Sequence, residues 1–443
     1  MPHLEPFRAL RYGSSAGPLD GLLAPPYDVI DEQEAARLRA RSPWNAVRLV
    51  LPEGEAPARY ETAARRLEEW ESDGILVRDQ VPSVTLVRQR FTAPEGPSQR
   101  LALFAALRLE SYGSGGVVPH ERTHSGPRRD RLALTLATRA QLSPVFFAAH
   151  DLDGALLEGL QDALDDAAGG SAAQVVRAEA PDGTVHEVRT LSGDAARAVC
   201  DAAGAGPLLI ADGHHRYETA LEVARSHAAG LPGADRVLAC VVSGGDPGLR
   251  IRATHRCIPA PPPGGGSWTE RLAARFALRF LPDGDGDAGR AGMSAGVAAA
   301  VAAAAADRAA RTGSLVVLTG GRAAVLSPSQ EAKKGGAGAA ASWDGLDDVD
   351  AAVPGIVFDR LVVEGILGRD ADEAARDGLL SYHRVPEEGA RAAGDEGALF
   401  LLPPAGLEAI RAVTALGRRL PPKSTYFEPK VPSGLLFRPL AED

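Results

Sequence analysis

Residues 207–224 read PLLIADGHHRYETALEVA. The run Pro207–Ala211 is short and apolar, which is typical of a buried strand. Beyond it, apolar residues recur at helical spacing at Tyr217, Ala220, Leu221 and Ala224. The stretch therefore predicts a strand that turns directly into a helix, a unit typical of α/β proteins.

The turn Asp212-Gly213-His214-His215-Arg216 joins the two elements and suits an anion. The first N–H groups of a helix have no intrahelical partner, and the helix dipole adds partial positive charge there. Gly213 permits close approach of the backbone, while both histidines and Arg216 supply side-chain donors. We predict that the turn binds a nucleotide phosphate. The plainer interpretation is an Asp212 helix cap followed by surface histidines.

Strand and helix patterns alternate over the rest of the chain, so we expect a mixed α/β (α+β) fold. The run AVRLVL at 46–51 reads as a further strand. With 443 residues, the chain exceeds what one hydrophobic core usually supports. Composition suggests three segments: a core at 1–258, a Gly/Ala/Pro-rich elaboration at 259–345, and a C-terminal α/β segment at 346–443 whose tail packs on the core.

Net charge and composition exclude several classes of protein. A net charge of −10 argues against a nucleic-acid partner. No apolar run reaches the length of a membrane helix, and the first residues do not resemble a signal peptide, so we expect a cytoplasmic protein without a membrane partner. The three cysteines are far apart and form no C-x-x-C pair, which fits a reducing compartment and disfavours a cysteine zinc site.

Residues 120–124 read HERTH, which matches the zinc-protease pattern H-E-x-x-H. That motif needs a sustained helix, but Pro119 precedes it here and Gly126-Pro127 follows it. We therefore favour a polar loop beside a site. Glu121 could act there as a base, and His120 or Arg122 could contact phosphate. A solvated loop is the alternative.

Two further segments carry candidate residues. Asp28 follows a double proline and Tyr27, at the end of an extended run, where a catalytic carboxylate or a helix cap would lie. Lys423, Ser424 and Thr425 are rich in donors and could close over an anion, or form a structural tail. Lys423 and Lys430 also belong to the four lysines among 48 basic residues, which draws attention to this segment.

Neither of the common glycine-rich nucleotide-binding patterns supports a nucleotide site elsewhere in the chain. Residues 284–289 read GDGDAG and match G-x-G-x-x-G, but two aspartates would face the ligand phosphates, so we interpret this segment as a linker. The chain has no G-x-x-x-x-G-K-[ST] sequence. Any nucleotide chemistry is therefore not of the P-loop kind.

Six sequence blocks are spread along nearly the whole chain: APPYDVI (24–30), HERTHSGPRRDR (120–131), TRAQLSPVF (138–146), IADGHHRYETAL (210–221), THR (254–256) and PPKSTYFEPKVPSGL (421–435). Together, and in this order, they resemble the blocks of the DUF1015 family. The turn at 212–216 also resembles the phosphate-binding turn of the ParB/sulfiredoxin superfamily, which includes free-serine kinases. This resemblance implies a ParB/sulfiredoxin-like core with large elaborations.

The resemblance also narrows the chemistry. Sulfiredoxin-type activity needs a cysteine where this sequence has His214, so that activity is not expected. The kinase relatives imply transfer of phosphate from ATP or ADP, with Mg²⁺ and few direct protein ligands to the metal, to free L-serine. The acid would be Asp28 or Glu121, with His215 and Arg216 stabilising charge on the transferring group.

The same relatives suggest further contacts to substrate or phosphate, at Tyr27, Thr123 and Arg131. They also leave one alternative, a ParB-like regulatory protein that binds or slowly hydrolyses nucleotide. In both cases the expected partner is a nucleotide, joined in the kinase by a small-molecule substrate.

Overall fold

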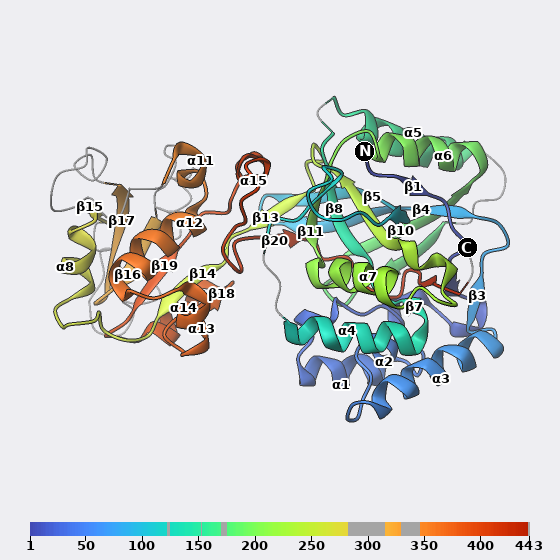
Figure 1. Cartoon of the computed structure of the whole chain (residues 1–443), viewed down its shortest axis with the longest axis horizontal. Helices are drawn as coiled ribbons and strands as arrows, with labels where there is room; N and C mark the ends of the chain where they lie inside the picture. The colour runs from blue at the N-terminus through green and yellow to red at the C-terminus, as the bar shows by residue number, and fades with distance from the viewer. Residues whose placement is uncertain (122–124, 152, 170–174, 282–314, 329–345, 442–443) are drawn as a thin grey trace. The chain divides into compact units, whose positions relative to one another are not determined.

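The computed structural model describes the chain except residues 122–124, 152, 170–174, 282–314, 329–345 and 442–443. It contains two compact units. Unit 1 comprises Met1–Pro119, Thr123–Arg250 and Phe427–Asp443, and unit 2 comprises His120–Arg122 and Ile251–Tyr426 (Figure 1).

This division differs from the three segments expected from composition. The described strands between 259 and 345 form part of the sheet of unit 2, and the chain returns to unit 1 after Tyr426. The boundaries after residues 250 and 426 fall within short strands, β13 (Arg250–Arg252) and β20 (Tyr426–Glu428). Composition alone cannot reveal such a boundary, because no linker-like sequence marks it.

The main sheet of unit 1 has nine strands in the described part of the chain. In sheet order they are β6 (Val117–Val118), β11 (Leu208–Asp212), β8 (Val145–Ala149), β12 (Arg236–Ser243), β5 (Gly96–Arg108), β4 (Ser83–Ala93), β10 (Val185–Ser192) and β9 (Val176–Glu179), with β1 (Leu4–Glu5) paired to β5. Strand β11 runs parallel to β6 and antiparallel to β8, which is itself parallel to β12. The protein is thus a mixed α/β protein with a large mixed sheet.

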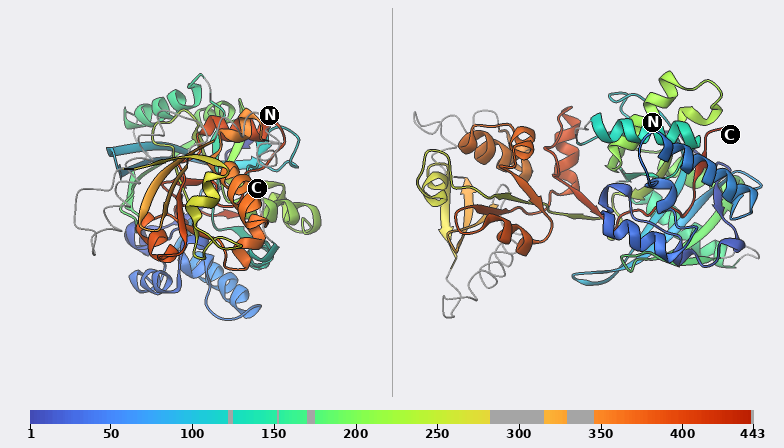
Figure 2. Two further views of the ribbon diagram at one scale, coloured as in Figure 1. Left: turned by 90° about the vertical axis from the view of Figure 1, so that its left-hand side faces the viewer. Right: turned by 90° about the horizontal axis from the view of Figure 1, so that it is seen from below.

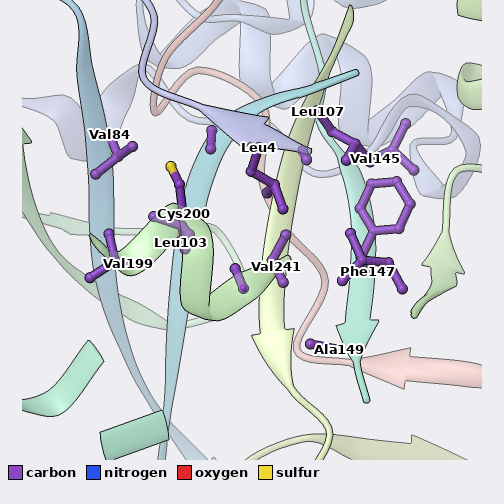
Figure 3. Packing of buried hydrophobic residues seen from close by; sticks show 14 of the residues in the cluster. Leu4, Val84, Leu103, Leu107, Val145, Phe147, Ala149, Val199, Cys200 and Val241 are labelled. Carbon is purple, nitrogen blue, oxygen red and sulfur yellow. The ribbon is translucent and has the colours of Figure 1, made fainter. Parts of the chain in front are cut away.

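One core of unit 1 lies between this sheet and the helices α5 (Ala155–Gly169), α6 (Gly193–Ala203) and α7 (His214–Ser226). Leu103, Ala105 and Leu107 alternate along β5 and so all point into it. Figure 3 shows Val199 and Cys200 of α6 packed near the strands that bear Val84 and Leu103. Leu208 and Ile210 of β11 and Tyr217 of α7 belong to the same core, so both elements beside the turn at 212–213 are anchored in it.

A second core of unit 1 is largely helical. It gathers α1 (Glu32–Arg41), α2 (Val47–Val50), α3 (Ala58–Ser72), α4 (Ser125–Thr138), β2 (Leu10–Tyr12) and β3 (Leu76–Arg78). Helix α4 packs against α3 and against α7 (Figure 1). The remaining short elements of unit 1 are η1 (Ser14–Ala16), η2 (Leu19–Gly21), η3 (Tyr27–Val29), η4 (Pro232–Asp235), β7 (Ala140–Gln141) and β21 (Arg438–Pro439).

The predicted strand at 46–51 was wrong, because this segment forms the short helix α2. Asn45 explains the difference: its Oδ1 accepts the N–H of Val47 at 2.9 Å, and its Nδ2 donates to the carbonyl oxygens of Gly21 and Leu23. These bonds start a helical turn that buries Val47 and Val50. A short apolar run does not by itself distinguish a strand from a buried helix.

In the described residues of unit 2, six strands form a sheet in which each neighbouring pair is antiparallel. Its order is β15 (Phe276–Phe280), β17 (Arg322–Pro328), β16 (Leu315–Thr319), β19 (Ala398–Leu401), β14 (His255–Ile258) and β18 (Ser381–His383). Val317 and Phe400 face one core, and Val316 and Leu399 face another, as the pleat requires. The strands can be followed in Figure 2.

The described helices of unit 2 are α8 (Trp268–Ala273), α11 (Asp348–Ala351), α12 (Pro354–Phe358), the π-helix η5 (Asp359–Leu367), α13 (Ala371–Arg376), α14 (Pro386–Ala393) and α15 (Leu407–Ala415). Side chains of α8, α12, η5 and α13 pack in the core on one face of the sheet, and those of α14 pack in the core on the other. None of the helices in the described part of the chain is long and apolar enough to cross a membrane.

Candidate functional site

The predicted strand, turn and helix are confirmed at residues 208–226. Strand β11 ends at Asp212, Gly213 adopts a left-handed conformation with φ 94° and ψ 31°, and α7 starts at His214. A Cβ on Gly213 would lie 2.9 Å from Cζ of Arg216. Glycine is therefore required here both by the backbone conformation and by the close passage of the arginine.

The carboxylate of Asp212 accepts hydrogen bonds from two cationic side chains, Lys430 and Arg216. The Nζ of Lys430 donates to Oδ1 at 2.5 Å, and Nη2 of Arg216 donates to Oδ2. Nη1 of Arg216 also donates to the carbonyl oxygen of Pro144, at the start of β8. All three charged side chains are at most 14% exposed. We call Asp212, Arg216 and Lys430 the charge cluster.

The charge cluster sets the ionisation of Asp212. Burial by itself would raise the pKa of this carboxyl, but Lys430 and Arg216 outweigh burial and hold it well below its ordinary value, with a smaller contribution from His214. Asp212 is therefore ionised at every physiological pH. With two cations and one anion, the charge cluster carries one net positive charge at the N-terminus of α7.

Arg100 of β5 fixes the chain just before Lys430. This guanidinium is fully buried; Nη1 donates to the carbonyl oxygen of Glu428 at 3.0 Å and Nη2 to that of Pro429 at 2.7 Å. Gln89 holds the guanidinium from the other side, at 2.8 and 2.6 Å. Burial lowers the pKa of Arg100 to about 10, so it stays charged near neutrality. Arg100 thus positions Lys430 through the backbone.

Helix α7 is held in place by Tyr217. Its hydroxyl donates to the carbonyl oxygen of Glu110 at 2.9 Å, and its ring stacks on Tyr112 with centroids 5.5 Å apart. Before it in the helix, His214 is buried and His215 is half-buried. The first turn of α7 is therefore rigidly anchored, which suits a preorganised anion site.

Tyr27 and Arg131 contact each other, whereas Asp28 lies on the surface. Arg131 lies over the ring of Tyr27, 4.0 Å from its centroid, and donates to Val50 and Asp130. Burial raises the pKa of Tyr27, which Arg216 partly offsets. Asp28 lies in the 3-10 turn η3, not at a strand end, and is exposed.

A small cavity of about 40 Å³ lies between α4 and α7 and is lined by Arg131, Ser143, Arg216 and Thr219 among others. Its volume suits ordered water and not a nucleotide. The Oγ1 of Thr219 is buried without a hydrogen-bond partner in the described part of the chain, which is consistent with a water at this position.

The other predicted residues form a second group, within unit 2. His120 Nε2 and Thr425 Oγ1 lie 2.7 Å apart, and Glu121 Oε1 accepts the backbone N–H of Lys423 at 2.7 Å. Glu121 also forms a bridge with Leu420. These contacts join the start of the HERTH segment to the KST segment, although 302 residues separate Glu121 from Lys423.

Within this group, Ser424 donates through its hydroxyl to the carbonyl oxygen of Pro421 at 2.7 Å. Lys423 has a positive φ of 58°, an uncommon conformation for a residue with a side chain, and is exposed. The segment is therefore held by local bonds, while the ammonium of Lys423 faces solvent.

Three predicted features fall wholly or partly outside the described residues: Arg122, Thr123 and the GDGDAG segment at 284–289. Glu121 lies in a β-bridge, so the zinc-protease helix is not formed at this position. Among the residues that the structure describes, no group of three or more His, Cys, Asp or Glu side chains could hold a metal ion.

Residues 4–349 match the family described as "Protein of unknown function (DUF1015)". The chain belongs to the DUF1015 family. Among curated proteins, none matches the sequence.

This DUF1015 chain is also similar to solved structures. A free serine kinase mutant in complex with ADP has 12% sequence identity and a TM-score of 0.33, over 72% of this chain and 89% of that one. SbnI with a C-terminal truncation, from Staphylococcus aureus, has 13% identity and a TM-score of 0.37, over 76% and 88%. A conserved hypothetical protein from Pyrococcus furiosus has 13% identity and a TM-score of 0.30, over 72% and 90%.

Lys430 is the residue of this DUF1015 protein that motif reasoning missed. It lies 218 positions from Asp212, so no local pattern connects the two. One signal was available: lysine is rare in this arginine-rich chain, and two of its four lysines fall between 423 and 430. That signal identified the segment but not the partner.

Proposed function

We propose that this protein is a small-molecule kinase which binds the phosphates of ATP or ADP at the turn Asp212–Arg216 and phosphorylates an alcohol, with free L-serine as the acceptor. One observation carries the proposal. Two nearly buried cations, Lys430 and Arg216, meet one carboxylate at the N-terminus of the thirteen-residue helix α7. The motif resemblance of the turn to free-serine kinases supplies the reaction class, and it also implies the ParB/sulfiredoxin-like core.

Charge and geometry support a phosphate at this position. The charge cluster has one net positive charge, and the helix N-terminus adds about half a charge more. Because the side chains are nearly buried, water screens these charges weakly, and their attraction for an anion is stronger than at an open surface. Asp212 keeps both cations ordered before the ligand arrives, so little reorganisation accompanies binding.

Magnesium would enter as part of the nucleotide substrate. Mg²⁺ usually keeps several waters and binds through substrate phosphates with one or two carboxylates. The donor set fits this mode: no cluster of three metal-binding side chains is present among the described residues, and Asp212 is already engaged by two cations.

The transfer itself requires an oriented hydroxyl. The serine hydroxyl oxygen would attack the terminal phosphorus of the donor, the bond from that phosphorus to the leaving nucleotide oxygen would break, and the hydroxyl proton would pass to a carboxylate. Asp28 in unit 1 and Glu121 in unit 2 are the candidates for this acid. His215 and Arg216 would stabilise charge on the transferring group.

The test is direct. The pure protein is incubated with Mg²⁺, L-serine and either ATP or ADP, and O-phosphoserine is measured by mass spectrometry. We expect phosphoserine to form with at least one donor. If nucleotide binds but no phosphorylated product forms across a panel of amino acids and small alcohols, the kinase proposal fails and a nucleotide-binding regulatory role replaces it.

The acid is identified by paired variants. Asp28→Asn and Glu121→Gln each remove one proton acceptor with little change in shape. We expect one of the two to lower kcat by about a hundredfold or more, while the dissociation constant for ADP stays within about threefold. Turnover that survives both substitutions would remove both residues from the mechanism.

A further inference from the structure

Unit 2 contains a pocket of about 460 Å³, a volume typical of small-molecule sites. It is an open pocket lined by α11, α12, the π-helix η5, the start of α13 and the loop 417–422. None of the residues considered above for phosphate or serine lines it. A π-helix is rare and is often found at functional sites.

Charged side chains dominate the wall of this pocket. Five carboxylates and three guanidiniums line it, which leaves an excess of two negative charges. These residues are Asp350, Asp359, Glu364, Asp370, Asp372, Arg360, Arg418 and Arg419.

Three of the five carboxylates already have partners. Arg418 lies 2.9 Å from Asp350, and Arg360 lies 2.6 Å from Glu364. Asp370 accepts the backbone N–H of Asp372 at 2.9 Å, as the cap of α13. The two remaining carboxylates, Asp359 and Asp372, have no hydrogen bond or ion pair within the described part of the chain.

Asp359 is the more unusual of the two, because it is only 9% exposed and lines the pocket without a partner. Burial raises the pKa of Asp359 to about 7; Arg256 of β14 opposes this, and Glu364, Asp370 and Asp372 add to it. Arg256 does not satisfy the carboxylate, since it donates to the carbonyl oxygens of Thr254 and Pro422. Asp359 is therefore a buried carboxylate that feels the charge of Arg256 but has no hydrogen-bonded cation among the described residues.

The lining of the pocket favours an organic cation over a metal ion. No set of three metal-binding side chains converges among the described residues of this pocket. The volume also far exceeds what one ion needs. A ligand with one ammonium group for each unpartnered carboxylate would match both the charge excess and the space.

We propose that this pocket binds a small organic dication, a linear diamine, with one ammonium group on Asp359 and the other on Asp372. The inference is independent of the kinase proposal, because it uses neither the charge cluster nor the acids Asp28 and Glu121.

Isothermal titration calorimetry of the full chain tests the proposal with three ligands of matched length. The ligands are 1,4-diaminobutane, butylamine and 1,4-butanediol, which carry two, one and no positive charges. We expect the diamine to bind, butylamine to bind at least about tenfold more weakly, and the diol to give no heat. A diol that binds as well as the diamine, or no diamine binding at about 10 mM, would overturn the proposal.

Variants locate the binding. Asp359→Asn and Asp372→Asn each remove one charge with little change in shape, and we expect either to weaken diamine binding by about tenfold or more. Glu373→Gln is the matched control, since Glu373 is an exposed acid on α13 that does not line the pocket. Equal affinity in wild type and both asparagine variants would contradict the assignment, and thermal melting verifies that each variant is folded.

The pH dependence gives a separate readout. The diamine stays protonated up to about pH 9, whereas Asp359 ionises around neutrality. Diamine binding should therefore tighten from about pH 6 to about pH 8 in the wild type and lose this dependence in Asp359→Asn. A wild-type affinity independent of pH over this range would contradict a role for Asp359.

Discussion

Asp212 is a buried carboxylate with two cationic partners: Arg216, four positions later in the first turn of α7, and Lys430, from the C-terminal segment. Taking Asp212 away leaves two cations without a compensating charge in a poorly hydrated place, which is costly. The charge cluster therefore stabilises unit 1 as well as offering positive charge to a ligand, and the two roles can be measured separately.

The stability role has a defined pH dependence. Asp212→Asn should lower the free energy of unfolding by about 3 kcal/mol near neutral pH. Because the folded pKa of Asp212 is depressed, its contribution is present above the unfolded pKa of about 4 and is lost as pH falls below that value. Urea unfolding at several pH values should show the gap between wild type and variant closing in acid.

Asp201→Asn supplies the control for this measurement, since Asp201 is exposed on α6. It should change the unfolding free energy by less than about 0.5 kcal/mol at any pH. A gap for Asp212→Asn that stays constant down to about pH 3 would show that the carboxylate charge does not stabilise the fold.

Gly213 offers a second test at the residue scale. Gly213→Ala imposes strain at φ 94° and drives a Cβ against Arg216, whereas Gly154→Ala imposes similar strain at φ 77° with no atom within 4 Å. Both should cost about 1–2 kcal/mol of stability. Only Gly213→Ala should weaken ADP binding, by about tenfold or more in calorimetry. Equal ADP affinity in the two variants would mean that the position of Arg216 is unimportant.

At the scale of elements, the segment 427–431 matters because it delivers Lys430 to the end of β11. Arg100 holds that segment through two carbonyl oxygens, and Phe427 packs edge-on against Phe146 of β8, with ring centroids 6.1 Å apart. Arg100 does not contact Asp212, so any effect of Arg100 on ligand binding would pass through the backbone before Lys430.

Arg100→Met should therefore reduce ADP affinity by about fivefold or more, in addition to destabilising unit 1, because Gln89 and both carbonyl oxygens lose their donor. Calorimetry below the unfolding temperature separates the two effects. Gln89→Leu is the comparison, since it removes the partner of Arg100 without touching the segment. Unchanged ADP affinity in a folded Arg100→Met variant would contradict the positioning role.

Some secondary-structure elements could be predicted from the sequence, and others could not. The strand, turn and helix at 208–226 follow from local periodicity and from Gly213, and both were visible in the sequence. Helix α2 was not, because Asn45 and its bonds to residues 21 and 23 override a β-like run. The pairing of Lys430 with Asp212 was also hidden, because it depends on tertiary structure over 218 positions.

For the whole molecule, the two units have separate hydrophobic cores, and the three cysteines are distributed between them. Cys200 and Cys240 are buried in unit 1, and Cys257 is buried in unit 2. Each thiol can react with a labelling reagent only when its unit opens. The labelling rates of the three native cysteines therefore report which unit a ligand stabilises.

Saturating ADP should protect the thiols of unit 1 selectively. At about a hundredfold excess over the dissociation constant, binding stabilises the bound unit by about 2.7 kcal/mol, so labelling of Cys200 and Cys240 in urea should slow by about a hundredfold. Labelling of Cys257 should change much less. Mass spectrometry of the labelled peptides gives all three rates, and protection confined to Cys257 would place the nucleotide in unit 2.

The most direct test of the charge cluster as a phosphate site is the affinity for ADP, measured by calorimetry in wild type, Lys430→Met, Lys430→Arg and Arg225→Met. Arg225 is an exposed cation near the other end of α7 and serves as the charge control. We expect Lys430→Met to weaken ADP binding by about tenfold or more, Lys430→Arg to recover part of that loss, and Arg225→Met to match wild type. ADP affinity that is the same in wild type and in a folded Lys430→Met protein would contradict the site.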